Sequence, residues 1–242
     1  LVGLYEPTRG GLTFDGQDAH AAFKGSNAKA MRRRIQMIFQ DPYASLNPRW
    51  LVEDIIAEPL REHGLISDKA ALKERVGQLL TSVGLAAADM AKYPHQFSGG
   101  QRQRISIARA LATEPEFLVC DEPTSALDVS VQAQVLNIMK DLQRERHLTY
   151  LFISHNLAVV RHVSDQVGVM YLGRLVEIAD KQELFARPRH PYTRMLLDAI
   201  PKMHDTGRAR TPVQGEVPNP LNPPAGCAFN PRCPHANDRC RT

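Results

Sequence analysis

The feature that most limits the folds open to this chain is an alternation of short apolar runs and helical patterns after residue 104. Phe117-Leu118-Val119-Cys120 and Tyr150-Leu151-Phe152-Ile153 each predict a buried strand. The run between them is amphipathic at helical spacing, through Val131, Val135, Ile138, Met139 and Leu142. Asp128 is the candidate N-cap of that helix. Strands separated by helices predict an α/β fold with a mainly parallel sheet covered on both faces.

Four further runs predict short strands, at residues 11–14, 35–39, 167–172 and 175–179. Asp15-Gly16 predicts a turn after the first of them. From about residue 42 to 96 the pattern is helical, and its apolar positions recur at three- and four-residue steps, as at Leu72, Val76, Leu79, Leu80 and Val83. Beyond about residue 202 the chain is rich in Pro, Asn and Gly, which predicts an extended tail.

Composition excludes several classes of protein. The chain has 242 residues, 43% hydrophobic and 23% charged, which is ordinary for a soluble globular protein. Its net charge of +4 is too small to argue for nucleic-acid binding. No apolar run approaches the roughly 18 residues of a membrane-spanning helix, and no signal peptide opens the sequence, so we expect a cytosolic protein, docked on a membrane protein at most.

Two carboxylates and a histidine follow the two apolar strands. Asp121 and Glu122 come directly after the first strand, where ligands bind in open parallel sheets. Asp121 is a candidate Mg²⁺ ligand, and Glu122 a candidate base for an attacking water. His155 follows the second strand, where it could contact a γ-phosphate and sense its loss. The alternatives are a solvated acidic pair and a structural histidine.

Two more candidates lie upstream. Gln40 ends the strand at 35–39 and precedes a turn, where it could contact water or Mg²⁺. The run Ser98-Gly99-Gly100-Gln101 precedes a helix predicted over 104–111, and glycines allow a close approach of backbone to an anion. The alternative for that run is a plain glycine-rich turn. Arg102 and Arg104 are expected to be solvated or to have partners within their own domain.

In this order, the motifs resemble those of the nucleotide-binding subunits of ATP-binding-cassette transporters. The likeness rests on Gln40, the signature Ser98 to Gln101, Asp121-Glu122, the loop from Ser125 to Asp128, and His155. It implies that ATP and Mg²⁺ are the cofactors, with catalytic Glu122, His155 and Gln40 and with Asp121 and Gln40 at the metal. It also implies that the signature, Ser98 to Gln101, acts on an ATP held by a partner subunit, and that Asp128 is a nucleotide-binding residue.

One family motif has no counterpart in these residues. The phosphate loop, G-x-x-x-x-G-K-[ST], is expected just upstream of a helix that ends in Leu1-Val2-Gly3-Leu4. Hydrogen bonds to phosphate contribute roughly 1.5–3 kcal/mol each, so without that loop we expect weak ATP binding. The residues are therefore expected to be part of a longer motor subunit. A non-hydrolysing remnant cassette is the alternative.

Three stretches narrow the subfamily. Residues 39–48, 190–193 and 223–234 resemble the glutamine loop, a late helix and the C-terminal extension of the dipeptide and oligopeptide importers. Glutathione and nickel importers, which have related subunits, are alternatives. In this family the extension can carry an iron–sulfur cluster. Three ligands of a [4Fe-4S] cluster would be Cys227, Cys233 and Cys240, with a fourth ligand beyond Thr242. The alternative is a zinc site with His235 as the fourth ligand. Cys120 is expected to be an ordinary core residue.

The resemblance implies partners and domains. The partners are a second ATPase, expected to be a different chain, two permease subunits contacted near Trp50, Leu51 and Ile55, and indirectly a peptide-binding protein, but no nucleic acid. Ordinary core is the alternative for those three residues. The predicted place is the cytoplasmic face of the bacterial inner membrane. A soluble cassette ATPase of translation or DNA repair is disfavoured, since neither a second cassette nor a coiled-coil insertion is present. The predicted domains are an ATPase-core segment at 1–40, a helical subdomain at 41–104, the rest of the core at 105–201 and an extension at 202–242.

Overall fold

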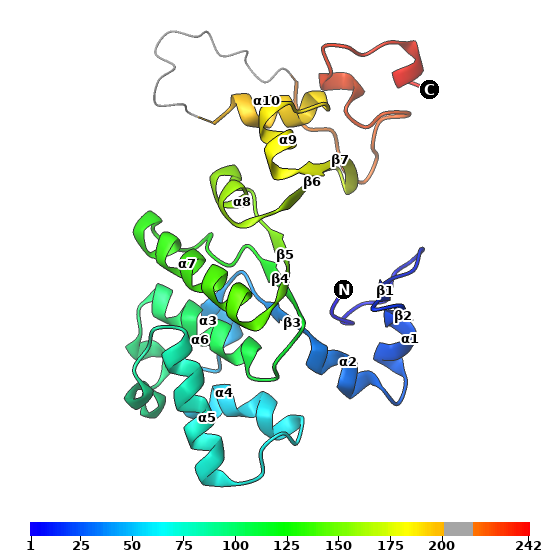
Figure 1. Cartoon of the computed structure of the whole chain (residues 1–242). Coiled ribbons are helices and arrows are strands. Elements are labelled where there is room, and N and C mark those ends of the chain that lie inside the picture. The colour runs from blue at the N-terminus through cyan, green and yellow to red at the C-terminus, as the bar shows by residue number, and fades with distance from the viewer. Residues whose placement is uncertain (201–214) are drawn as a thin grey trace. The chain divides into compact units, whose positions relative to one another are not determined.

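The computed structural model describes residues 1–200 and 215–242, which form two compact units, Leu1–His155 and Asn156–Thr242 (Figure 1). No helix among the described residues is long and apolar enough to cross a membrane. The predicted boundary between 201 and 202 lies outside the described residues, and the other domain boundaries stay predictions.

A three-stranded parallel sheet forms the centre of the first unit. Its strands are β3 (Ile35–Ile38), β4 (Phe117–Asp121) and β5 (Thr149–Ile153), in the order β3-β4-β5. The predicted α/β class and parallel pairing are thus confirmed. Helices α6 (Gly99–Leu111) and α7 (Val129–Arg146) cover one face of this sheet (Figure 1).

Strand β5 is less buried than its apolar sequence predicts. Tyr150 and Phe152 pack on the main core, whereas Leu151 and Ile153 are 38% and 43% exposed. Successive side chains of a strand point to opposite faces, and only one face of β5 meets that core. The prediction that residues 150–153 form a fully buried strand, covered on both faces, is therefore wrong, whereas Leu118, Val119 and Cys120 of β4 are buried as predicted.

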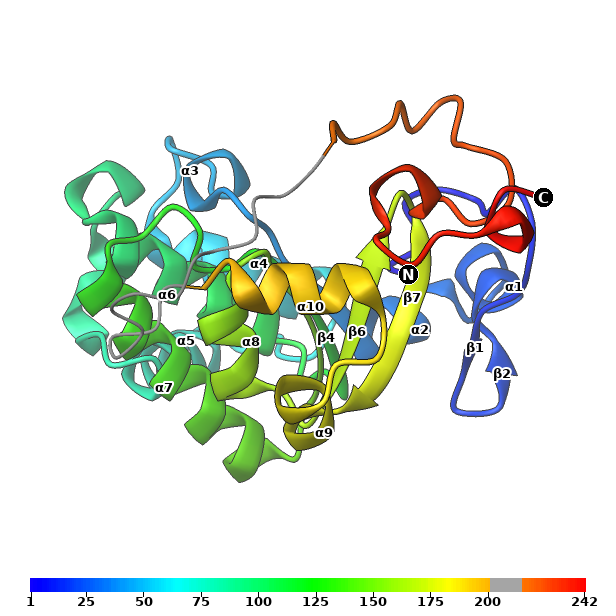
Figure 2. The same cartoon turned by 90° about the horizontal axis from the view of Figure 1, so that it is seen from above.

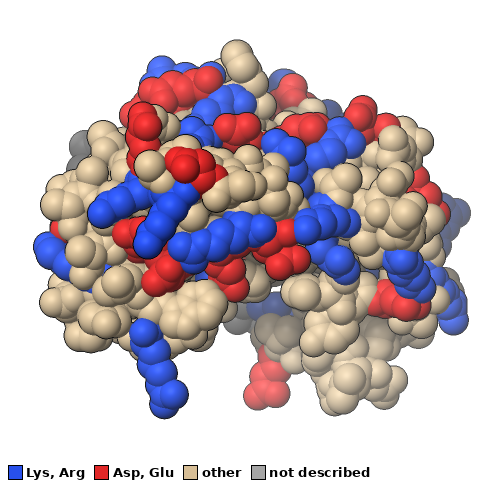
Figure 3. Space-filling view, turned by 90° about the horizontal axis from the view of Figure 1, so that it is seen from below, with Lys and Arg blue, Asp and Glu red and all other residues tan. Residues whose placement is uncertain are grey.

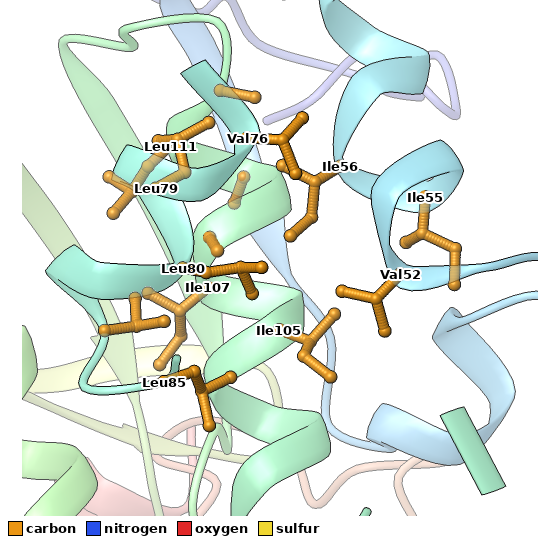
Figure 4. Packing of buried hydrophobic residues seen from close by; sticks show 14 of the residues in the cluster. Val52, Ile55, Ile56, Val76, Leu79, Leu80, Leu85, Ile105, Ile107 and Leu111 are labelled. Atoms are coloured by element: carbon orange, nitrogen blue, oxygen red, sulfur yellow. The ribbon is translucent and has the colours of Figure 1, made fainter. Parts of the chain in front are cut away.

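Short helices fill residues 42–96, as the periodicity predicts. They are α3 (Pro42–Ser45), α4 (Val52–Glu62), α5 (Lys69–Ser82), and the 3₁₀ turns η1 (Ala87–Ala91) and η2 (Pro94–Gln96). Figure 4 shows how α4, α5 and α6 share one apolar core, through Val52, Ile55, Ile56, Val76, Leu79, Leu80, Ile105, Ile107 and Leu111. This core holds α6 in a fixed place relative to the preceding helices.

The first 34 residues contribute to a second, smaller apolar cluster, which also includes Ile35 of β3 and packs on Phe117 of β4. Strands β1 (Thr13–Phe14) and β2 (Gln17–Asp18) make a hairpin, followed by α1 (Ala19–Lys24) and α2 (Ala28–Arg34). The predicted turn at Asp15-Gly16 is confirmed, and both residues have left-handed backbone angles, with φ of 50° and 73°. Such angles match the twist of a two-residue hairpin.

The second unit is built on an antiparallel hairpin of β6 (Gln166–Tyr171) and β7 (Arg174–Asp180), as predicted. Its helices are α8 (Leu157–Val163), α9 (Lys181–Ala186) and α10 (Pro191–Asp198), and apolar residues of all three pack against the hairpin (Figure 2). The described part of the tail contains 3₁₀ turns η3 (Asn230–Arg232) and η4 (Asp238–Cys240).

The tail is more ordered than its composition predicts. Phe229 is 2% exposed, and its ring lies 5.2 Å from that of Tyr171 and 5.6 Å from those of His190 and Tyr192. Burial of one aromatic side chain contributes roughly 1.5–3 kcal/mol, enough to hold a short segment in place. Phe229 thus anchors the segment around it on the second unit, while the part of the predicted extended tail at 202–214 lies outside the described residues.

Candidate functional site

Three predicted catalytic side chains meet at the carboxyl edge of the parallel sheet. Glu122, directly after β4, accepts a hydrogen bond of 3.0 Å from the Gln40 amide, which follows β3. Its other carboxylate oxygen lies 2.8 Å from Nδ1 of His155, which follows β5. Because the strands are parallel and adjacent, their ends bring together residues that are 82 and 33 positions apart in the chain.

The backbone at Glu122 turns sharply. Its φ is 44°, in the left-handed region, which costs a residue with a Cβ about 1 kcal/mol. The Glu122 N–H donates to the Ile153 carbonyl, and the Glu122 carbonyl accepts from the Ser125 hydroxyl. A strained backbone held by neighbouring hydrogen bonds is a feature that clusters at active sites.

The exposure of this group suits a site that opens to a ligand. The Glu122 side chain is 22% exposed, while that of His155 is 73% exposed. An ionised carboxylate only accepts hydrogen bonds, so His155 Nδ1 carries the proton in their contact. The opposite ring nitrogen is then the one left for a ligand.

Asp121 and Gln40 fit the predicted Mg²⁺ site by their chemistry. Asp121 is the last, partly exposed residue of β4, next to Glu122. The Gln40 amide nitrogen points to Glu122, which leaves its amide oxygen for a cation. The described residues hold no group of three or more His, Cys, Asp or Glu able to bind a metal. The Asp121 carboxylate and the Gln40 amide oxygen are the kinds of ligand that Mg²⁺ takes in proteins, where phosphate and water oxygens complete the coordination.

The signature run lies inside α6, not before it. Ser98 is the N-cap, and its hydroxyl accepts from the Gln101 N–H while the Gln101 side chain accepts from the Ser98 N–H. The helix predicted over 104–111 thus begins at Gly99, and Gly99 and Gly100 occupy its first turn. This corrects the prediction, which missed the capping box of Ser98 and Gln101 as a helix-start signal.

Asp128 lies at the start of a neighbouring helix. Its carboxylate accepts from the Val131 N–H at 2.9 Å, so the predicted N-cap of α7 is confirmed. This bond, with one from the Ser130 hydroxyl, lowers the pKa of Asp128 below its usual value. A Cβ placed on Gly100 would lie 2.1 Å from Cγ1 of Val131, a contact that sequence reasoning missed.

The arginines of α6 bind within the unit. Arg102 lies over the Tyr43 ring, 3.9 Å from its centroid, and Arg104 donates to Gln134 at 2.8 Å, which confirms their predicted intradomain role. Arg109, which the sequence analysis did not single out, donates to the Ser45 carbonyl at 2.6 Å. Burial lowers its pKa. The available sequence signal for this contact was an arginine on an otherwise apolar helix face.

On the face of the molecule shown in Figure 3, basic and acidic side chains are interspersed.

The predicted permease contacts have different environments. Trp50 is 40% exposed, Leu51 is half-buried, and Ile55 is 1% exposed. Ile55 therefore belongs mainly to the core of the helical segment, but it also lines a pocket beside Trp50, so its assignment as a permease contact stays a prediction. A pocket of about 510 Å³ lies beside Trp50, and its wall includes residues 43–48, Glu58 and Arg109.

The three tail cysteines are not assembled into a metal site. The Cys227 N–H donates to the Cys240 carbonyl at 2.9 Å, but among the described residues no cluster of ligands includes them, Cys233 or His235. The predicted iron–sulfur cluster and its zinc alternative therefore have no support in the structure. Cys120 is buried, and burial raises the pKa of its thiol, as expected of a core residue.

Comparisons with known proteins define the class of this site. Residues 1–125 match the family model described as "ABC transporter", and residues 176–240 match "Oligopeptide/dipeptide transporter, C-terminal region". Among solved structures, CbiO1 of Clostridium perfringens, part of an ABC transporter complex, is similar with a TM-score of 0.67 and 27% identity, covering 77% of this chain and 72% of its own. The ADP- and phosphate-bound cassette MJ0796 is similar with a TM-score of 0.66 and 26% identity, covering 74% and 77%.

Curated relatives have a higher sequence identity to this chain than these two structures. The oligopeptide transport ATP-binding protein AppF of Bacillus subtilis is 51% identical over 100% of this chain and 74% of its own length. The di/tripeptide transport ATP-binding protein DppF of Pseudomonas aeruginosa is 53% identical over 100% and 75%. The chain therefore belongs to the ATP-binding proteins of the ABC transporter family, in its oligopeptide/dipeptide branch.

Proposed function

We propose that this chain is the ATP-binding and ATP-hydrolysing motor of an ABC importer for dipeptides or oligopeptides. The observation that carries the proposal is the meeting of Gln40, Glu122 and His155 at one sheet edge, in a chain whose relatives are named peptide transport ATP-binding proteins. ATP hydrolysis by this chain energises the uptake of peptides.

Each side chain of the edge has a chemical role. The Glu122 carboxylate accepts the proton of the attacking water, and Gln40 holds that carboxylate in place through its amide N–H. His155, oriented through Nδ1, presents its other nitrogen to the γ-phosphate. The Asp121 carboxylate and the Gln40 amide oxygen would hold Mg²⁺, which would supply positive charge to the phosphate oxygens.

The start of α6 serves a second subunit. Ser98, Gly99, Gly100 and Gln101, with Asp128, bind the nucleotide held by a partner ATPase, and the partner is a different chain in our proposal. The exposed Ser98 hydroxyl at a helix N-terminus supports this role, because such a terminus favours phosphate. The ATPase pair works beneath two permease subunits at the cytoplasmic face of the bacterial inner membrane, and a peptide-binding protein delivers the substrate.

We place the permease contact at Trp50 and the pocket beside it. The exposed indole and the half-buried Leu51 supply apolar surface, while Glu58 and Arg109 line the pocket with charge. Aromatic side chains with one exposed edge are common anchors of protein interfaces. The iron–sulfur cluster has no comparable support and is not part of the proposed function.

The substitution Glu122→Gln in the assembled transporter tests the proposal. It removes the base while keeping the size and the contact to Gln40, so we expect ATP turnover to fall by roughly 10²–10⁴-fold while ATP stays bound. Hydrolysis and nucleotide retention are the measurements. Glu145→Gln, an exposed position of α7, is the matched control and should keep full turnover. Normal turnover in Glu122→Gln would sink the assignment of the base.

A further inference from the structure

Gly100 lies where two helices approach closely. It is buried in the first turn of α6, and a Cβ there would be 2.1 Å from Cγ1 and 3.5 Å from Cβ of Val131 on α7. A separation under 3 Å between carbons is a severe overlap. Valine in a helix strongly prefers one side-chain rotamer, so Val131 cannot simply turn away. A side chain at position 100 would therefore push the two helix starts apart.

The neighbouring contacts extend along the same two helices. A Cβ on Gly99 would meet Leu127 at 3.7 Å, an ordinary van der Waals distance. One turn further along, Arg104 donates to Gln134 at 2.8 Å. Val131 is the link at the centre, since its side chain packs on Gly100 while its N–H is bonded to Asp128.

We propose that Val131 is a positioning residue for the nucleotide site shared with the partner subunit. Packed on Gly100, it holds the N-cap of α6, Ser98, and the N-cap of α7, Asp128, in one fixed arrangement. The lack of a Cβ at Gly100 is then required because Val131 occupies that space, in addition to any contact of its backbone with the nucleotide. This inference rests on the proposed function, because that function assigns Ser98 and Asp128 to the partner's nucleotide.

Thermal unfolding of the nucleotide-free subunit tests the packing alone. Alanine is a better helix former than glycine, so without an overlap Gly100→Ala should raise the melting temperature by roughly 2 °C. With the overlap we expect Gly100→Ala to lower it by several degrees. In the Val131→Ala background the overlapping Cγ1 is gone, and the nearest atom of residue 131 is its Cβ, 3.5 Å away. There Gly100→Ala should raise the melting temperature. Gly99→Ala is the matched control and should not lower it.

ATP hydrolysis by the assembled transporter tests the positioning. We expect Gly100→Ala to lose roughly 10²-fold in rate, in line with the loss of a preorganised phosphate contact. Val131→Ala should lower kcat by roughly 10-fold with a smaller change in the KM for ATP, since the misplaced Ser98 and Asp128 contribute more to the transition state of hydrolysis than to ATP binding. Gly100→Ala combined with Val131→Ala should regain the rate of Val131→Ala.

Two results would overturn the inference. A Gly100→Ala variant that melts at or above the wild-type temperature would show that no overlap exists. A Gly100→Ala, Val131→Ala double variant that melts normally but hydrolyses ATP as slowly as Gly100→Ala would show that the missing Cβ leaves room for the nucleotide and not for Val131. Failure of the proposed function is distinguishable, because then the wild-type transporter would not hydrolyse ATP, while the melting temperatures would still test the packing.

Discussion

At the residue scale, two nearby positions at the end of β4 have opposite environments. Cys120 is buried and its thiol has a raised pKa because burial disfavours the thiolate. Two positions later, Glu122 is partly exposed and its carboxylate has two partners. The end of the strand separates them, because Cys120 lies within β4 whereas Glu122 follows its last residue in a left-handed turn.

We expect the four cysteines to differ in reactivity. The thiolate is the reacting species, so iodoacetamide at pH 8 should modify exposed Cys227 at least ~100-fold faster than Cys120 in the folded protein. Cys233 and Cys240, which are half-buried, should fall between. Peptide mass spectrometry against time measures each rate, and the urea-unfolded protein is the control in which all four should react alike. Equal rates for Cys120 and Cys227 in the folded state would contradict the burial.

At the element scale, one side chain of β7 fixes the start of α10. The Glu177 carboxylate accepts from the N–H groups of Arg189 at 2.8 Å and His190 at 2.9 Å. Burial by itself would raise the pKa of Glu177, but the Thr193 hydroxyl and these two N–H groups outweigh it and lower the pKa. The loop that leads into α10 is therefore held by a charged acceptor.

This arrangement predicts a pH dependence of stability. Because the folded pKa of Glu177 is depressed, its contribution is present above the unfolded value of about 4.3 and is lost as pH falls through the folded value. Glu177→Gln should destabilise the protein by about 1–2 kcal/mol at pH 7, and this difference should shrink below about pH 4. Thermal unfolding from pH 3 to 7 measures it, with exposed Glu216→Gln as control. A difference that does not change with pH would refute the role of the charge.

At the scale of the whole molecule, the proposed site is divided between subunits. In the proposed function, the edge with Glu122 acts on this chain's own nucleotide, whereas the start of α6 acts on the partner's. Each ATP site is then formed by two chains, so a change at the start of α6 should affect hydrolysis at the partner subunit's site.

The substitution Ser98→Arg tests this division. A large cation at the α6 N-cap should lower hydrolysis of the partner's ATP by on the order of a hundredfold, because it displaces the hydroxyl and the first helix turn. The measurement is ATP hydrolysis in transporters in which Glu122→Gln has inactivated the other site, the one for this chain's own nucleotide. Ala71→Arg, an exposed position in the first turn of α5, is the control and should hydrolyse normally. An unchanged rate in Ser98→Arg would refute the shared site.

How much could be predicted depended on whether a signal was local. The strand ends that carry Gln40, Glu122 and His155 followed from short apolar runs, and the cap at Asp128 followed from residue type. Other features involve residues far apart in the chain and left no local signal. These include the Arg109 bond to Ser45, the Phe229 anchor and the exposed face of β5.

The sequence by itself determined the class of fold, the order of the motifs and the helix and strand periods, because these depend on residue type and spacing over a few turns. The tertiary structure was needed to show that Gly100 lies against Val131, that Ile55 is core and that no group of metal ligands among the described residues includes the tail cysteines. The physical reason is that packing and side-chain contacts depend on which helices and strands become neighbours, and the free energy of that choice is spread over the whole core.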